Sequence, residues 1–330
     1  MRAAIVTRYG PPAVLRIVEI PAMVPRRGEV IVRQCATSVS AGDARIRGAR
    51  IPRGFGLILR VVFGWNRPRQ PVLGIAVAGV VARIGAGVTD LAPGDRVMGT
   101  TAMAMGAHAE EVAIKANRLL PLPAGLSMAA AAALPFGALT ALFFLRDRAR
   151  VAAGDRVLVI GASGAVGAAM VQLAVLMGAK VTAVCSGPNA ALVRGLGATR
   201  VIDYRTEDFR AMGERQDVIV DCVGKTTAPD ARAALVPGGR LCLVVAPLVA
   251  ILTAGWQSRR NGIRVLTGTG GEAPADLAAL AGLVATGALS PLIGATFPFD
   301  QIAEAHTLCD SGRKIGNTVI LFGEVAQTPA

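Results

Sequence analysis

The chain has 330 residues, of which 53% are hydrophobic, and its 35 Lys and Arg outnumber its 22 Asp and Glu to give a net charge of +13. That length allows two domains with sizeable cores, and the apolar content excludes a largely disordered chain. No uninterrupted apolar run reaches the roughly 20 residues of a membrane span, and the first residues form no signal-peptide stretch. We therefore expect a cytoplasmic protein without a transmembrane segment.

Short β-branched runs separated by glycine and proline turns make up the first part of the chain, to about Pro121. Examples are Val30–Val32, Ala78–Ile84 and Arg96–Met98. Short strands bounded by turn residues predict a small, irregular β-barrel-like domain. The pattern changes after Ser127, where the alanine-rich stretch Met128–Leu134 predicts a helix and Pro135–Leu145 its broken continuation.

Strand and helix patterns then alternate. The predicted strands are Val157–Ile160, Lys180–Val184, Arg200–Ile202, Val218–Asp221 and Gly239–Val245. The predicted helices between them are Ala165–Met177, Ala190–Leu196, one before Val218, and Thr227–Leu235. Such alternation implies right-handed crossovers and a parallel sheet covered on both faces. The apolar stretch Leu241–Trp256 is broken by Pro247, and we expect a core strand that runs into a loop.

The last part of the chain leaves the alternating pattern at about Gly268. The predicted order is a helix at Ala275–Ala285, a loop through Pro291 and Pro298, a helix at Ile302–Leu308 and a strand at Thr318–Leu321. We expect this last strand to return to the first domain.

A glycine-spaced turn in Val157–Gly167 (VLVIGASGAVG) is the strongest functional signal. An apolar strand ends at Gly161, and a helix follows at once from Ala165. This order suits a dinucleotide pyrophosphate, because small residues let the backbone approach the phosphates and free N–H groups at the helix start face their charge. The alternative is a tight turn of purely structural value, since a glycine triplet alone is a weak signal.

Cysteine and histidine usage argues against metal or disulfide chemistry. The five cysteines are Cys35, Cys185, Cys222, Cys242 and Cys309. They form no C-x-x-C pair or Cys/His cluster, so neither a disulfide framework nor a structural zinc site is indicated, and we expect a reducing compartment. The two histidines, His108 and His306, lie far apart in the sequence, and we expect structural roles for both.

Arginines are densest between Arg45 and Arg69, where they alternate with apolar residues such as Leu57, Val61 and Trp65. One interpretation is a solvated rim around an apolar loop. The other is an amphipathic segment that covers the active site or touches a membrane surface. The arginines are otherwise spread along the chain without an aromatic-interleaved basic tract, so we do not expect a nucleic-acid partner.

Many short motifs, in order along nearly the whole chain, resemble zinc-independent medium-chain dehydrogenases/reductases of the quinone oxidoreductase (zeta-crystallin-like) branch. They are Ala36–Asp43, Pro71–Gly74, Ala78–Val81, Pro93–Val97, Ala107–Glu110, Leu139–Ala141, Gly161–Gly167, Leu196–Ala198, Val201–Tyr204, Asp221–Gly224 and Pro237–Arg240. The resemblance implies an α/β fold in which residues 1–123 and 268–330 form a GroES-like catalytic domain with an irregular β-barrel. Residues 124–267 would form a Rossmann domain with a doubly wound parallel sheet, and the active site would lie between the two.

The resemblance also implies an NADPH-dependent transfer of hydride to a quinone or an α,β-unsaturated carbonyl compound. Zinc-dependent relatives place ligands at positions that here hold Ser40, Ile75 and Ala76, none of which is a strong zinc ligand. An alternative within the enzyme class is a zinc-independent alcohol or aldehyde reductase. An alternative outside it is a non-catalytic NADPH-binding sensor or an RNA or protein interaction module, because some relatives bind RNA.

Cofactor residues follow from the matched motifs. The family pattern assigns to NAD(P) the residues Thr140, Ser163, Gly164, Ala165, Val166, Ser186, Asn189, Tyr204, Val223, Gly224 and Ala246. No carboxylate occurs from Val184 to Asn189 to repel a 2′-phosphate, so we expect NADPH, with NADH as the alternative. Arg194 is either a phosphate ligand or a solvated helix residue. Thr140 lies near the nicotinamide or only packs its helix, and ordinary strand ends resemble Val223, Gly224 and Ala246.

Ser40 and Asp43 are the candidate catalytic residues that the family pattern offers. Ser40 would help backbone N–H groups to stabilise a developing oxyanion, and Asp43 would orient its neighbours or, alternatively, act in acid–base chemistry. Arg45 and Arg47 either recognise an anionic substrate or are rim charges. The expected partners are a small hydrophobic carbonyl or quinone substrate and a second copy of the chain, with Leu243–Leu252 as the apolar dimer interface.

Overall fold

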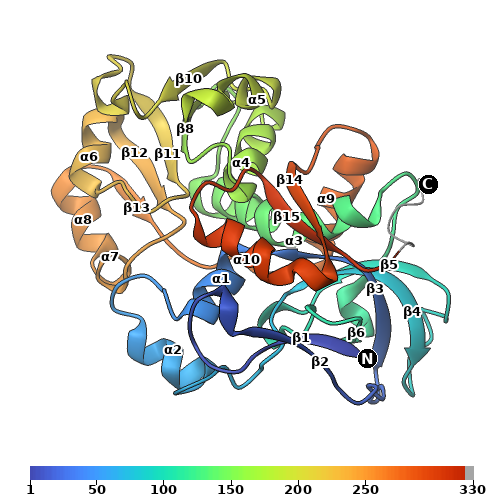
Figure 1. The fold of residues 1–330 in the computed structure, drawn as a ribbon. Coiled ribbons are helices and arrows are strands. Elements are labelled where there is room, and N and C mark those ends of the chain that lie inside the picture. The colour runs from blue at the N-terminus through green and yellow to red at the C-terminus, as the bar shows by residue number, and fades with distance from the viewer. Residues whose placement is uncertain (324–330) are drawn as a thin grey trace. The chain divides into compact units, whose positions relative to one another are not determined.

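The computed structural model describes residues 1–323 and separates into two compact units (Figure 1). The first unit comprises Met1–Ile51, Gly56–Phe136 and the residues from Glu272 onward. The second comprises Gly137–Gly271 together with the short segment Pro52–Phe55. The units are compact bodies rather than assigned domains, and the domain limits given above stay a prediction.

A six-stranded, wholly parallel sheet forms the centre of the second unit (Figure 1). Its order is β10 (Arg200–Asp203), β9 (Lys180–Cys185), β8 (Arg156–Ile160), β11 (Gln216–Asp221), β12 (Leu235–Leu243) and β13 (Arg264–Leu266). The chain runs outward from β8 in one direction and then from β11 in the other. The crevice at the carboxyl ends of β8 and β11 is therefore the topological switch point, where open α/β sheets bind ligands. The predicted parallel sheet is confirmed.

Helices cover this sheet and explain its apolar strands. They are α4 (Ala165–Leu176), α5 (Ala190–Gly195), α6 (Ala228–Ala234), α7 (Leu248–Leu252) and α8 (Ala254–Asn261). Leu158, Ile219 and Leu241, from three neighbouring strands, are fully buried in one cluster. Between β10 and β11 the structure has only the 3-10 turn Phe209–Ala211 instead of a full helix.

The expected core strand at the start of Leu241–Trp256 is confirmed, but the loop expected after it is wrong. Strand β12 ends at Leu243, and α7 and α8 begin after Pro247. Pro247 has extended backbone and caps α7, so proline here starts a helix, as its fixed φ favours at a helix start.

The first unit is built on a seven-stranded mixed sheet. Its order is β14 (Ile293–Pro298), β15 (Asn317–Leu321), β3 (Glu29–Val39), β4 (Ala76–Ile84), β5 (Arg96–Thr100) and β7 (Leu119–Pro121), with β6 (Glu111–Lys115) also on β3. A separate hairpin joins β1 (Arg2–Val6) to β2 (Leu15–Glu19). The helices are α1 (Ala41–Gly48), α2 (Gly56–Phe63), α9 (Pro274–Ala285) and α10 (Ile302–Asp310).

The last described strand returns to the first unit as expected. Strand β15 lies antiparallel to β3, with Ile320 opposite Thr37. The expected loop through Pro291 and Pro298 is wrong, because β14 occupies most of it and pairs in parallel with β15. Pro298 is tolerated as the last residue of β14, which is an edge strand of the sheet.

Helix α3 (Met128–Leu142) continues without a break as the π-helical turn Phe143–Ala149. Pro135 lies inside α3, so the predicted interruption there is wrong. Together the 22 residues are long and apolar enough to cross a membrane. However, 67% of an apolar 18-residue stretch within them is buried inside the protein. The core helix of a globular protein meets the same criteria of length and composition. The expectation that no segment of this chain would meet them is therefore corrected.

Candidate cofactor and active site

The glycine turn predicted from the sequence lies at the switch point of the second unit. Gly161 follows β8 with a positive φ of 83°, and a Cβ there would lie 2.6 Å from Val223 Cγ2, just after β11. At Gly167 a Cβ would overlap the carbonyl oxygen of Gly161. The two glycines thus let the start of α4 approach the strand ends more closely than any other residue would.

The start of α4 offers free backbone donors. Gly164 is the N-cap residue, and its N–H donates to the Gly161 carbonyl (3.1 Å). Among the described residues no side chain caps this helix, so the N–H groups of Ala165 and Val166 have no side-chain acceptor there. Such a helix start binds a phosphate group through its N–H groups and its dipole.

Two hydroxyls and an amide connect this turn to the end of β9. The Asn189 side-chain amide donates to Ser163 Oγ (3.1 Å) and to Ser186 Oγ (3.2 Å). Three predicted cofactor residues, from the turn after β8 and the turn after β9, therefore form one network. Each hydroxyl keeps its proton for a further acceptor, which is the donor pattern that a phosphate or ribose needs.

The loop after β11 is held by a buried carboxylate, which the sequence analysis quoted only as part of a motif. Asp221 is fully buried and accepts hydrogen bonds from four backbone N–H groups, at 2.7 to 2.8 Å. Two of these belong to the predicted cofactor residues Val223 and Gly224, and the other two to Lys225 and Thr226. Asp221 thus positions the predicted residues without exposing any of its own side chain.

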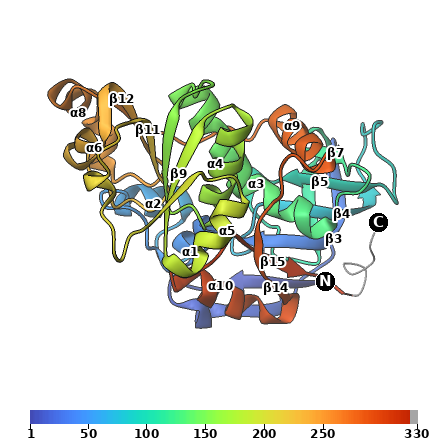
Figure 2. The same cartoon turned by 90° about the horizontal axis from the view of Figure 1, so that it is seen from above.

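Helix α3 reaches the same place through Gly137. A Cβ at Gly137 would lie 2.7 Å from the carbonyl oxygen of Ala165, so the two helices touch through their backbones, and Figure 2 shows them side by side. Thr140 lies three residues on and hence on the same face of α3. The predicted residue Ala246 is buried directly after β12.

The region beside the end of β9 carries both signs of charge. Tyr204 is 60% exposed, and the guanidinium of Arg205 lies 5.9 Å from the centre of its ring. The sequence analysis missed Arg205, which is a cation next to the residue expected at the 2′-phosphate. It also missed Asp203. The Asp203 carboxylate lies so close to Gly187 that a Cβ there would overlap it, and it accepts a hydrogen bond from the backbone N–H of Arg205 (3.0 Å).

The cysteines of this unit are unreactive thiols. Burial raises the pKa of Cys242 to about 12 and that of Cys222 further still. Burial also raises the pKa of Cys185, although the charge of Arg194 opposes that rise. Burial thus disfavours the thiolate form in all three cysteines.

In the first unit, Ser40 and Asp43 form the capping box of α1. Ser40 Oγ accepts the Asp43 N–H (3.2 Å) and donates to Asp43 Oδ2 (2.5 Å), which also accepts the Ser40 N–H (2.8 Å). The other oxygen, Asp43 Oδ1, accepts the N–H of Gly74 (3.0 Å). Both side chains are buried, so this geometry favours an orienting role for Asp43, and the catalytic assignment of the pair stays a prediction.

Replacing Ser40 by alanine is expected to lower turnover more than it changes the affinity for NADPH, because the predicted cofactor residues all lie in the second unit. It should also cost about 1 kcal/mol of unfolding free energy through the lost cap. Thr227→Ala removes a capping box of the same kind from α6 and serves as the stability control. Steady-state kinetics and thermal unfolding separate the effects, and a loss of NADPH affinity with normal turnover would exclude Ser40 from the substrate site.

Arg47 is not a substrate ligand or a rim charge. It is fully buried and donates to Asp310 Oδ2 (2.6 Å), to the Gly10 carbonyl (2.5 Å) and to His306 Nδ1 (3.3 Å). His306 packs edge to face against His108, whose Nε2 lies 3.1 Å from the Ser38 carbonyl oxygen. Both histidines are therefore core residues, and burial holds the pKa of His306 well below its usual range.

Two family models match the chain, one described as an alcohol dehydrogenase GroES-like domain (residues 26–124) and one as a zinc-binding dehydrogenase (residues 196–320). The Homo sapiens protein named NAD(P)H oxidoreductase RTN4IP1, mitochondrial, is 31% identical over 97% of this chain and 89% of its own length. The Arabidopsis thaliana protein named NADPH-dependent alkenal/one oxidoreductase, chloroplastic, is 28% identical over 97% of this chain and 79% of its own.

Among solved structures, the quinone oxidoreductase from Coxiella burnetii superposes with a TM-score of 0.86 at 28% identity. The match covers 97% of this chain and 99% of that one. These similarities confirm the predicted fold class, a GroES-like domain combined with a doubly wound parallel sheet.

Proposed function

Because this chain belongs to the medium-chain dehydrogenase/reductase family, we propose that it is an NADPH-dependent oxidoreductase that reduces a quinone or an α,β-unsaturated carbonyl compound. The names of the Arabidopsis and Coxiella relatives supply the two substrate classes. Quinones and α,β-unsaturated carbonyl compounds have in common that an electron-poor carbon, conjugated to a carbonyl group, accepts a hydride.

The observation that carries the proposal is the cradle at the switch point of the second unit. The positions of Gly161 and Gly167 admit no Cβ, and the uncapped start of α4 directs N–H groups to the same side. When bound, NADPH supplies the hydride. Gly164, Ala165 and Val166 would hold its pyrophosphate.

The remaining predicted residues surround this cradle. Ser163, Ser186 and Asn189 would donate hydrogen bonds to the ribose and its phosphate, and the loop fixed by Asp221 would border the nicotinamide half. Arg205, beside Tyr204, offers a cation for the 2′-phosphate, and the Arabidopsis relative named as NADPH-dependent supports the phosphorylated cofactor.

We propose that the reaction needs no zinc, although one matching family model is described as zinc-binding. The positions of the catalytic ligands hold Ser40, Ile75 and Ala76, and the Ser40 hydroxyl already bonds to Asp43. Within the described part of the chain, no three His, Cys, Asp or Glu side chains are grouped so as to hold a metal ion. Charge that develops on the substrate oxygen would then be stabilised by backbone N–H groups, and by Ser40 once its hydroxyl turns from Asp43 to the substrate, and the proton would come from solvent or a relay.

The protein is proposed to act in the cytoplasm as a homodimer. All five cysteines are free, which suits a reducing compartment. Val249 and Leu252 of α7 are 63% and 76% exposed, and an apolar helix face of this kind supports a contact between two copies.

The proposal predicts NADPH-dependent reduction of quinones and enones, with NADPH bound more tightly than NADH. Fluorescence titration with both cofactors measures the preference, and NADPH oxidation over a panel of quinones, enones and aldehydes measures the reaction. Arg205→Ala should reduce the preference for NADPH about tenfold, since one cation next to a phosphate is worth on the order of 1 kcal/mol or more. Arg200→Ala, an exposed arginine at the opposite end of β10, should leave it unchanged.

Each other result has a defined meaning. Tight NADPH binding without turnover on any quinone or enone would refute the reductase assignment and favour a cofactor-binding sensor. Turnover confined to aldehydes would replace the proposed substrates by those of an alcohol or aldehyde reductase. Single-stranded RNA that binds in a salt-dependent manner and is displaced by NADPH would favour an interaction module.

A further inference from the structure

Helix α2 presents an exposed apolar stripe that no part of the described chain covers. Leu57, Val61 and Trp65 follow one another at intervals of four residues, with Ile58 and Val62 beside them. Their exposed fractions lie between 44% and 65%. Because residues four apart share one face of a helix, Leu57, Ile58, Val61 and Val62 form a single outward strip on α2, and exposed Trp65 follows just beyond the end of the helix.

The opposite face of α2 is anchored in the first unit, so the stripe is held outward by packing. Leu59 is only 3% exposed, and Phe63 packs against a buried cluster that includes Leu73 and Met105. The turn that follows is also fixed: the Tyr9 hydroxyl donates to the Gly64 carbonyl (2.8 Å). The helix Gly56–Phe63 takes the place of the apolar loop in one of the two interpretations, and its exposed apolar strip leaves open the other, a segment that covers the active site or touches a membrane surface.

The segment carries only positive charge. No Asp or Glu occurs between Ala44 and Thr89. The arginines on or beside α2 are Arg53, Arg60, Arg67 and Arg69. All four are exposed, and none of them is in an ion pair with any of residues 1–323.

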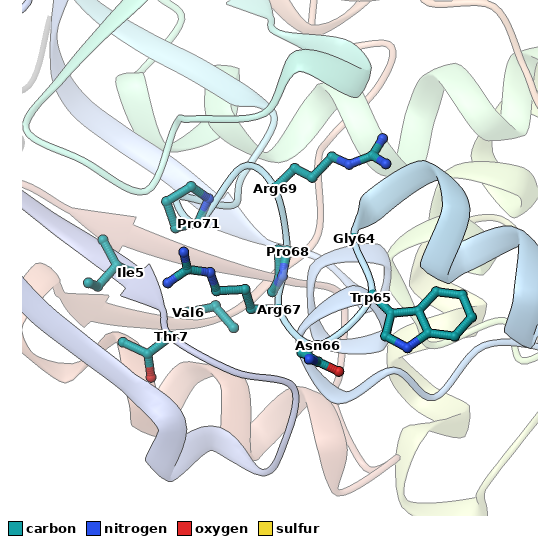
Figure 3. A pocket seen from close by; sticks show the side chains of 10 residues that line it. All are labelled: Ile5, Val6, Thr7, Gly64, Trp65, Asn66, Arg67, Pro68, Arg69 and Pro71. Carbon is teal, nitrogen blue, oxygen red and sulfur yellow. The ribbon is translucent and has the colours of Figure 1, made fainter.

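In the turn after α2, the side chains of Arg67 and Arg69 extend in different directions (Figure 3). Arg67 extends toward Ile5 over a hollow of about 630 Å³, whereas Trp65 and Arg69 extend away from β1. The Arg60 guanidinium lies 5.8 Å from the centre of the Trp65 ring, so a cation stands directly beside the largest apolar side chain. An aromatic ring between cations is the arrangement that favours the interface of a bilayer.

We propose that α2 and residues 64–69, together the α2 segment, dock the protein on an anionic membrane surface. The stripe would enter the boundary between headgroups and acyl chains, and the arginines would bind lipid phosphates. A bilayer is the occupant that the charge pattern favours, because it offers an apolar layer directly beneath a plane of negative charge. Docking of this kind needs no cofactor or substrate, so it goes beyond the proposed reaction and is tested separately from it.

Vesicle sedimentation tests the proposal on the full chain. Vesicles with about a third phosphatidylserine should bind the protein, and pure phosphatidylcholine vesicles should bind it at least about tenfold more weakly, since each arginine near an anionic surface contributes about fivefold. Trp256→Phe leaves Trp65 as the only tryptophan, and its fluorescence should shift to the blue on binding. Soluble glycerophosphoserine should not compete, and full competition would show a headgroup site in place of a surface.

Two variants and their matched controls identify the segment. Leu57→Ser/Val61→Ser/Trp65→Ser and Arg60→Ala/Arg67→Ala/Arg69→Ala should each reduce vesicle binding at least about tenfold while NADPH affinity and thermal unfolding stay unchanged. Val24→Ser/Met103→Ser and Arg26→Ala/Arg27→Ala, at equally exposed positions of the first unit, should bind as the parent does.

Unchanged vesicle binding in both α2 variants would overturn the proposal. It would also fail if the serine variant changed the oligomeric mass of the protein, because the stripe would then be a contact between copies of the chain. If an α2 variant lost turnover while its vesicle binding stayed that of the parent, α2 would instead cover the substrate.

Discussion

Replacing Asp221 by alanine is expected to destabilise the protein and to abolish NADPH binding. The change leaves four backbone N–H groups, from Val223 to Thr226, without the carboxylate that now accepts them. Only the hydrogen bond from Thr226 is fully buried, and the other three donors can bond to water, so we expect a loss of about 2 kcal/mol in unfolding free energy. The loop after β11 would also lose the conformation that brings Val223 against the glycine turn.

Chemical denaturation and NADPH titration measure the two effects. Asp221→Asn keeps one acceptor oxygen and the shape of the side chain, and it should lie between the parent and the alanine variant in both measurements. Asp230→Ala removes a carboxylate that caps α6 at the surface and should cost only about 1 kcal/mol without affecting NADPH. Normal cofactor affinity in a folded Asp221→Ala protein would show that the loop does not border the cofactor.

Short-range patterns were sufficient to predict most of the second unit. The strands from Val157 to Leu243 lie within a few residues of their predicted limits, because buried parallel strands are continuous apolar runs and glycine turns end them. The turn at 161–167 also has its predicted place between β8 and α4. These features depend on neighbours in sequence, and the sequence displays such neighbours directly.

Features that depend on distant contacts were missed. Strand β14 ends in a proline and has little β-branched character, and it exists because β15 offers it a partner. Arg47 resembles any surface arginine in sequence, yet Asp310 and the Gly10 carbonyl bury it. Tertiary context overrides local propensity in both cases.

The same limit applies to the candidate site. Ser163, Ser186 and Asn189 were chosen separately from the family pattern, and only the fold shows that one amide joins the two hydroxyls. Asp203 and Arg205 flank the predicted residue Tyr204 at the end of β10, but the sequence does not show that their charges lie beside the end of β9. Pairing of β9 with β10 brings the two strand ends together, and no spacing along the chain reveals that.

Gly167→Ala is expected to weaken NADPH binding at least about a hundredfold, although alanine is the better helix former. By propensity alone the change should stabilise α4 by about 1 kcal/mol. The added methyl group would instead overlap the Gly161 carbonyl oxygen and lie 2.8 Å from Ala162 Cα, both of which are backbone atoms that cannot rotate away. The first turn of α4 must therefore move from the end of β8, and its N–H groups move with it.

Gly195→Ala is the matched control for Gly167→Ala, because Gly195 also lies in a helix of the second unit and has open space around its Cβ position. Here propensity is unopposed, so the variant should gain up to about 1 kcal/mol and bind NADPH as the parent does. Thermal unfolding and NADPH titration are measured on both variants. If close packing decides the outcome, Gly167→Ala lowers the stability and the NADPH affinity, whereas Gly195→Ala raises the stability and leaves the affinity unchanged. Equal stabilisation of both variants, with NADPH affinity intact, would show that α4 need not approach β8 this closely, and the cradle would lose its role as the cofactor site.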